Sequence, residues 1–328
     1  MAVVAEARSF KAQWLALAAF VVLLGAFWIV AQYFGLLARL GGHTGSAMLS
    51  FALLLAPYWA FGFGLDEWLR RELTGAAARL LAPAALLLPY VVFTLPRDDF
   101  RWSMFAGLLS IVLSVTALLS LPRSLTPGWH DWLALAILGA SVEFHFFDSA
   151  WPIAGLSGMP KLLLVDAGLY AYLVVRPIGG IGFNFWPRSR DLVIGLREFL
   201  YFTPIALALG FLLGFLHLHK TLGNPLQFSI GWLFTLFFIA MPEELFFRGL
   251  LLNMLERRLG TPRALWITAL LFGLAHFNKR TAFFNWRYVI LAAIAGIFYG
   301  RAWLAQRRLL TSSLTHATVD TVWSIWLR

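Results

Sequence analysis

The stretch that decides the fold is "IGWLFTLFFIAMPEELFFRGLLLN", residues 230–253, an apolar run that contains three ionisable side chains. A helix of this length is long enough to cross a hydrocarbon core of roughly 30 Å. Glu243, Glu244 and Arg248 lie inside the run, where a charged side chain costs roughly 2.5–3.5 kcal/mol on insertion scales. Charges that are kept at such a cost need a partner or a chemical task.

The rest of the chain is also rich in apolar residues. It is 60% hydrophobic and 13% charged, with a mean hydropathy of +0.77. Apolar runs recur near 12–38, 47–65, 78–95, 102–121, 131–147, 161–176, 192–216, 227–254, 264–277, 287–304 and 309–326. The pattern predicts an all-α, polytopic transmembrane helix bundle of about eight to eleven spans. The count is open because 131–147 and 161–176 are short enough to form one re-entrant excursion instead.

Charge and cysteine content narrow the class further. The net charge of +10 comes from short basic clusters between apolar runs, which favours contact with membrane lipid headgroups and argues against nucleic acid as a partner. Clusters such as Arg70, Arg71 and Arg79 place the N-terminus in the cytoplasm by the positive-inside rule. The absence of cysteine excludes disulfides, thiol catalysis and cysteine metal sites. The oligomeric state is left open.

One link divides the chain. The basic, Pro- and Gly-containing segment "RPIGGIGFNFWPRSRD" at 176–191 predicts a set of N-terminal transmembrane helices, 1–190, and a C-terminal set, 191–328. The N-terminal set is expected to be accessory or to recognise substrate. Polar residues there that would mark a second polar cavity are Glu143, His145, Asp148 and Asp166.

Three polar constellations lie in the C-terminal set. Glu244 and Arg248 are one helical turn apart, which predicts a structural ion pair and leaves Glu243 as a spare carboxylate, suited to a general base or to a proton carrier. His276 follows Phe272 by four residues in "LFGLAHFN", and His316 precedes Asp320 by four in "LTHATVD". Counting ~1.5 Å per residue from the span ends brings all three constellations to one level of the bilayer.

Together these residues resemble a known family. "EELFFRG", "FGLAH" and "HATVD" are similar to the three signature motifs of the CPBP family of intramembrane endopeptidases, which includes the CAAX proteases and the bacteriocin-processing, Abi-like proteins. Those motifs are E-E-x-x-x-R, F-x-x-x-H and H-x-x-x-(N/D), and the resemblance covers roughly 192–328. It implies an intramembrane endopeptidase of the bacterial inner membrane whose partner is a membrane-anchored peptide or protein substrate.

The resemblance also implies roles for single residues. Glu243 with His276 would activate a water molecule, His316 and Asp320 would face the scissile carbonyl, and Glu244 with Arg248 would hold the helix. The catalytic set is then Glu243, His276, His316 and Asp320, with no cofactor. The chain has no H-E-x-x-H or G-x-S-x-G motif, which argues against the usual zinc-protease and rhomboid-like serine routes.

Two questions stay open at the sequence level. The same four residues offer N and O ligands for zinc or another divalent ion, so metal-assisted hydrolysis is an alternative. Asp320 stands where the prenyl endopeptidases of eukaryotes carry Asn, so it must be protonated, hold His316 as a cation or bind a metal. A rival of another class is a non-catalytic immunity protein or a proton-coupled transporter that uses the same buried groups.

Overall fold

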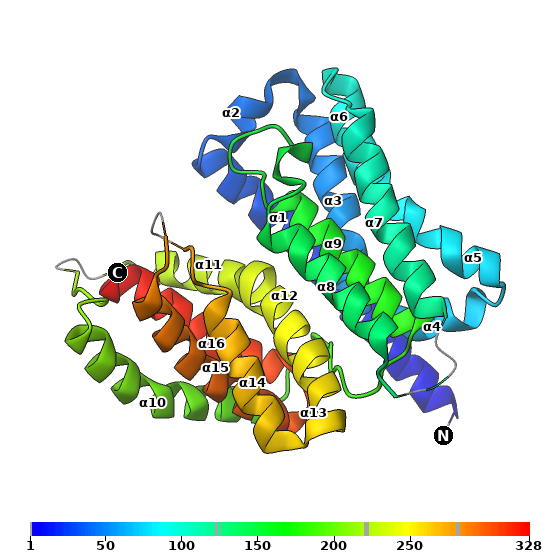
Figure 1. Cartoon of the computed structure of the whole chain (residues 1–328). Coiled ribbons are helices and arrows are strands. Elements are labelled where there is room, and N and C mark those ends of the chain that lie inside the picture. The colour runs from blue at the N-terminus through cyan, green and yellow to red at the C-terminus, as the bar shows by residue number, and fades with distance from the viewer. Residues whose placement is uncertain (1, 122–123, 125, 220–222, 280–282) are drawn as a thin grey trace. The chain divides into compact units, whose positions relative to one another are not determined.

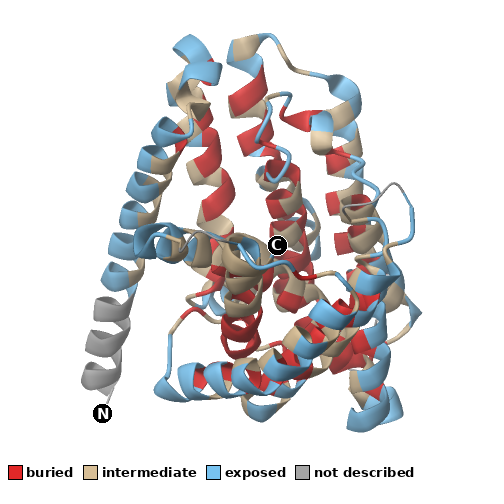
Figure 2. Cartoon of the chain, turned by 90° about the vertical axis from the view of Figure 1, so that its left-hand side faces the viewer, coloured by how far each residue is buried: buried red, intermediate tan, exposed pale blue. Residues whose placement is uncertain are grey.

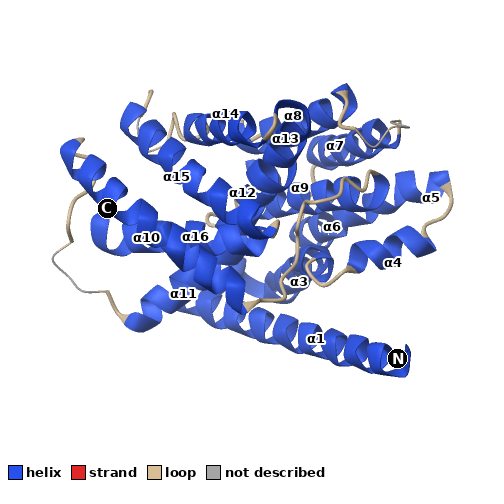
Figure 3. Cartoon of the chain, turned by 90° about the horizontal axis from the view of Figure 1, so that it is seen from below, coloured by secondary structure: helices blue, strands red, loops and turns tan. Residues whose placement is uncertain are grey.

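The computed structural model is built from helices (Figure 3). It describes residues 2–121, 124, 126–219, 223–279 and 283–328, and these residues form no strand. Seven helical segments are long and apolar enough to cross a membrane: 13–33, 36–61, 76–97, 102–120, 189–212, 225–259 and 286–306. The prediction of an all-α polytopic bundle is therefore confirmed, and the chain is an integral membrane protein.

The four remaining predicted spans are shorter helices. Those near 131–147 and 161–176 form two helices, α8 (Trp129–Glu143) and α9 (Met159–Leu169), the latter continuing as a π-helix over Tyr170–Val175. Those near 264–277 and 309–326 are α14 (Thr261–Leu274) and α16 (Leu309–Val322). Helix α14, with 14 residues, reaches only about 21 Å. Helix α16 is extended to Leu327 by a π-helical continuation but carries polar side chains such as His316 and Asp320. The seven segments therefore fall below the expected count of eight to eleven.

The chain forms two compact units, 1–178 and 179–328. The first consists of α1 (Ala2–Tyr33), α2 (Leu36–Leu40), α3 (Thr44–Phe61), α4 (Leu65–Glu72), α5 (Ala76–Leu81), α6 (Leu88–Thr94), α7 (Trp102–Ser120), α8 and α9 (Figure 1). Helix α1 is exposed along most of its described length (Figure 2), as suits an apolar helix that faces lipid.

A buried ion pair connects two helical segments of the first unit. Arg176, just beyond the π-helix, has Nε 3.0 Å from Asp131 Oδ1 near the start of α8, and both side chains are buried. Tyr172 donates its hydroxyl to the Asp131 carbonyl. The N–H of Gly128 donates to Asp131 Oδ2, which satisfies one free donor at the helix start. These contacts join the end of the α9 segment to the start of α8.

The second unit contains α10 (Ser189–Leu212), α11 (Pro225–Thr235), α12 (Met241–Glu244), α13 (Asn253–Leu259), α14, α15 (Trp286–Gln306) and α16 (Figure 1). Helices α11, α12 and α13 belong to one continuous helical segment, because π-helical turns join them over Leu236–Ala240 and Leu245–Leu252. Helix α16 likewise continues as a π-helix over Trp323–Leu327.

The boundary between the units falls inside the predicted link, after Ile178 instead of after residue 190. Residues that follow Ile178 belong to the second unit because its helices hold them. Trp303 Nε1 donates to the Ile181 carbonyl at 3.2 Å, and the Leu309 N–H donates to the Gly182 carbonyl at 2.9 Å. Gly182 has φ +76°, and a Cβ there would lie 2.1 Å from the Arg307 carbonyl oxygen, so only glycine fits.

Candidate active site

The ionisable residues of the stretch 230–253 lie where the helix departs from α geometry. Pro242 has no N–H, and its ring displaces the carbonyl one turn earlier. The preceding turn is π-helical over Leu236–Ala240, and a second π-helical stretch follows over Leu245–Leu252. Such turns are frequent at functional sites. They set the direction in which Glu243 and Glu244 project.

Glu244 and Arg248 form a fully buried ion pair. Arg248 Nη1 lies 2.8 Å from Glu244 Oε1, and both side chains are 0% exposed. Arg248 also donates through Nη2 to the Gly296 carbonyl of α15 at 3.0 Å. Its guanidinium lies 4.5 Å from the ring centroid of Phe272 and 5.3 Å from that of Tyr299. The arginine thereby joins three helices, which is the kind of contact that fixes a buried charge in place.

His316 lies at the centre of the cluster. Its Nδ1 is 2.9 Å from Glu244 Oε1, and its Nε2 is 3.4 Å from Asp320 Oδ2 and 3.8 Å from Glu243 Oε2. Both ring nitrogens thus face carboxylate oxygens, and both can donate only in the doubly protonated imidazolium. Tyr299 stacks on the His316 ring at 4.5 Å with 16° between the planes, which fixes the orientation of the imidazole.

Glu243 is the carboxylate that this network leaves over. Its side chain is 37% exposed, yet Oε2 is buried and accepts no hydrogen bond from any described residue. With His316 doubly protonated, His316 and Arg248 offset two of the three carboxylate charges that Glu243, Glu244 and Asp320 can carry. An ionised, unpartnered oxygen is an acceptor for a proton or for water.

His276 bonds to a backbone carbonyl of its own chain segment. No ion pair or hydrogen bond joins it to Glu243 within the described residues; its Nδ1 lies 2.8 Å from the Phe272 carbonyl oxygen one turn earlier. A carbonyl only accepts, so Nδ1 carries the proton and Nε2 of the neutral ring keeps its lone pair. The ring packs against Tyr288 at 4.7 Å.

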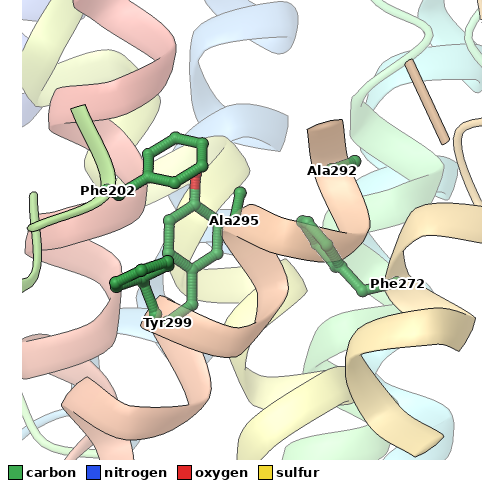
Figure 4. Close-up of a cluster of buried hydrophobic side chains, with 6 residues drawn as sticks. Phe202, Phe272, Ala292, Ala295 and Tyr299 are labelled. Carbon is green, nitrogen blue, oxygen red and sulfur yellow. The ribbon is translucent and has the colours of Figure 1, made fainter. Parts of the chain in front are cut away.

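An apolar cavity connects the two histidines. His276, His316 and Asp320 all line it. Most of its wall is aromatic or aliphatic and comes from α10, α14, α15 and α16; the buried cluster beside the histidines consists of Phe202, Phe272, Ala292, Ala295, Phe298 and Tyr299, five of which are labelled in Figure 4. The cavity therefore offers space for an apolar group next to ionisable side chains.

The metal alternative has less geometric support than the ion pairs. Among the described residues, no group of three or more His, Asp or Glu side chains could hold a metal ion. His316, one of the four residues considered for that role, has both ring nitrogens directed at carboxylates. Chelation remains the direct test of a metal requirement.

Sequence reasoning missed Tyr299 and the bond between Glu244 and His316. Tyr299 lies between Gly296 and Gly300 in "GIFYG", where the small residues allow close packing and the aromatic residue between them is the available signal. The Glu244–His316 hydrogen bond joins residues 72 positions apart, and no local sequence pattern predicts it. In the first unit, His145 and Asp148 pair at 2.9 Å on a partly exposed turn, whereas Asp166 is buried.

Comparison with known proteins supports the resemblance. Residues 225–322 match the family model described as "Type II CAAX prenyl endopeptidase Rce1-like". The match confirms the relation to the CPBP proteases and includes all six residues of the site. Comparisons with curated proteins and with solved structures gave no match.

Proposed function

Because residues 225–322 form an Rce1-like type II CAAX prenyl endopeptidase segment in an integral membrane protein, we propose that this endopeptidase hydrolyses a peptide bond of a membrane-associated protein or peptide by means of a water molecule that Glu243 activates. The observation that carries the proposal is the buried Oε2 of Glu243, which accepts no hydrogen bond from any described residue. It lies 3.8 Å from His316 Nε2. A water bound there would meet a proton acceptor beside a proton donor.

The proposed reaction has two parts. Glu243 takes a proton from water while the oxygen attacks the scissile carbonyl, which forms a tetrahedral oxyanion. An imidazolium at His316 donates to that oxyanion, and Glu244 on Nδ1 keeps the ring oriented. The proton held by Glu243 then goes to the leaving amine, so the hydrolysis needs no nucleophilic side chain.

His276 contributes from the cavity side in this proposal. Its Nδ1 is engaged by the Phe272 carbonyl, which leaves Nε2 to accept a hydrogen bond from water or from the substrate. Asp320 lies 3.4 Å from His316 Nε2. A carboxylate at that distance favours the imidazolium, which supports a role for Asp320 in keeping His316 cationic.

The experiment compares the protein termini that proteolysis generates in cells with the wild type and in cells with single variants. Membranes from cells that produce the wild type, Glu243→Gln or Glu256→Gln are digested, and newly formed protein termini are identified by mass spectrometry. Glu256 is a matched control because it belongs to the same continuous helix but pairs with Arg307. We expect termini that depend on the wild type to persist with Glu256→Gln and to vanish with Glu243→Gln at a nearly normal folded yield.

Persistence of those termini with Glu243→Gln would eliminate the glutamate mechanism. A wild type that generates no termini, combined with a change in peptide immunity or proton flux, would favour the rival reading as a non-catalytic or transport protein. Glu243→Gln purified with its bound substrate would also identify the peptide.

A further inference from the structure

A second charged cluster lies away from the candidate active-site residues, between α10 and α15, which pack side by side (Figure 1). Glu198 of α10 is completely buried and binds two arginines. Its Oε1 is 2.7 Å from Arg197 Nη2, and its Oε2 is 3.0 Å from Arg301 Nε on α15. One carboxylate between two guanidiniums leaves the cluster with a net charge of +1.

Both arginines are accessible from outside the protein. Their side chains are 45% and 44% exposed, whereas the carboxylate between them is 0% exposed. Arg197 donates through Nε and Nη2 to Glu198 Oε1, whereas Arg301 Nε lies 3.0 Å from Glu198 Oε2 without a hydrogen bond. Within the described part of the chain, Nη1 of Arg197 and both Nη atoms of Arg301 have no hydrogen-bond acceptor.

The arginine pair is fixed at a definite place. The Arg301 guanidinium lies 5.3 Å from the Phe298 ring and 5.8 Å from the Tyr201 ring, so it is held against aromatic faces as well as by Glu198. Guanidiniums restrained in this way lose less conformational entropy when a ligand binds.

The surroundings of the pair face lipid. Leu196, Leu200 and Tyr201 of α10 are each more than half exposed, and α10 is one of the membrane-competent helices. Arg197 lies roughly 12 Å from the start of α10, and Arg301 roughly 8 Å from the end of α15. Arginines near a helix end reach toward the polar boundary of the bilayer.

We propose that Arg197 and Arg301 form a binding site for the phosphate of an anionic phospholipid. Such a phosphate would neutralise the remaining positive charge and accept from the unused guanidinium donors in a bidentate manner. The acyl chains would lie along the exposed apolar face of α10. This site is independent of the proposed hydrolysis, because no atom of Glu243 or His316 takes part in it.

The test uses the full chain, delipidated in detergent and titrated with phosphatidylglycerol, phosphatidylcholine or inorganic phosphate, with bound lipid counted by native mass spectrometry. We expect phosphatidylglycerol to bind more tightly than phosphatidylcholine and to resist displacement by inorganic phosphate. Arg197→Gln and Arg301→Gln should each weaken phosphatidylglycerol binding by roughly five-fold. The control Arg188→Gln/Arg190→Gln removes two charges from the start of the same helix and should leave tight binding intact.

Each single variant removes one of the two arginines that pair with the buried Glu198, and this loss can destabilise the fold independently of lipid binding. The triple variant Arg197→Gln/Glu198→Gln/Arg301→Gln leaves no buried carboxylate there and should also lose tight phosphatidylglycerol binding. Wild-type affinity in the triple variant, or an equal loss in the Arg188/Arg190 control, would overturn the site. Displacement by inorganic phosphate would overturn its assignment to a lipid.

Discussion

At the residue scale, the site is a set of charges that hold one another in place. Glu244 Oε1 is hydrogen-bonded to both Arg248 and His316. A single carboxylate therefore links the structural ion pair to the imidazole that is proposed to donate to the oxyanion. Glu244 therefore does more than anchor a helix. Its loss should affect both stability and the orientation of the His316 ring, whereas the loss of Glu243 should affect chemistry alone.

Arg248→Ala should destabilise the protein strongly. The substitution leaves the buried Glu244 with His316 as its remaining partner and removes the donor to the Gly296 carbonyl, and breaking a buried pair costs ~3–5 kcal/mol. Thermal unfolding in detergent measures the effect. Arg263→Ala, at an exposed position on α14, serves as the control and should unfold near the wild-type temperature. An unchanged melting temperature for Arg248→Ala would show that the pair is not a structural one.

Asp320→Asn should remain substantially active, and strong chelation should not silence the wild type. Asn can still accept from His316 Nε2, which is 3.4 Å from Asp320 Oδ2, and it can donate to an oxyanion. Cleavage is measured for both proteins with and without chelator. In the metal alternative, losing this ligand weakens metal binding by at least roughly 10–100-fold. Activity lost to chelator and restored by zinc would establish the metal route.

At the element scale, the close approach of α14 to α15 controls where His276 lies. A Cβ at Gly273 would meet the Val289 carbonyl oxygen at 2.5 Å and the Ala293 Cβ at 2.7 Å, both on α15. Gly296 similarly packs against Ala269 of α14. Gly273 and Gly296 let the backbones of α14 and α15 approach closely. Packing inside the second unit therefore explains why Gly296 and Gly300 are spaced four residues apart.

Gly273→Ala should therefore lower stability by about 1–3 kcal/mol, because the methyl group forces the two helices apart. His276 lies three residues after Gly273, in the turn that follows α14, so activity should fall as well. The matched control is Gly231→Ala on α11, where a Cβ would have only Thr321 Cγ2 nearby, at 4.0 Å. Melting temperature and cleavage rate are compared for both variants. Wild-type values for Gly273→Ala would mean that the contact does not position α14.

At the scale of the whole molecule, the alternation of basic clusters predicts the topology. The start of α10 and the end of α13 lie at opposite ends of two consecutive membrane passages, so they share one side of the membrane. Because arginines lie near both points, the positive-inside rule predicts that this side is the cytoplasmic one. The proposed active site would then open nearer to the cytoplasmic face.

Single cysteines test this orientation cleanly because the chain has no native cysteine. Ser189→Cys and Leu259→Cys should react with a membrane-impermeant maleimide only from the cytoplasmic side. Leu218→Cys, in the link between α10 and α11, should react only from the other side. The reverse pattern would invert the topology, and labelling of Ser189→Cys and Leu259→Cys from different sides would remove one of the two passages.

The sequence by itself determined the class of the protein and the pairs that lie within one helix. Apolar runs of membrane length permit only helices in lipid, because every backbone group must find its partner inside the segment. A spacing of four residues puts Glu244 beside Arg248, and His316 beside Asp320, whatever surrounds them.

Only the tertiary structure decided which helix faces meet. In the folded chain Glu244 bonds His316 across 72 positions, Glu243 Oε2 lies 3.8 Å from His316 Nε2, and His276 Nδ1 faces the Phe272 carbonyl. Glu198 likewise pairs with Arg301 of α15, and the second unit begins at residue 179. The physical reason is that helical periodicity fixes neighbours along one helix, whereas the rotation of one helix against another depends on which side chains interlock between them.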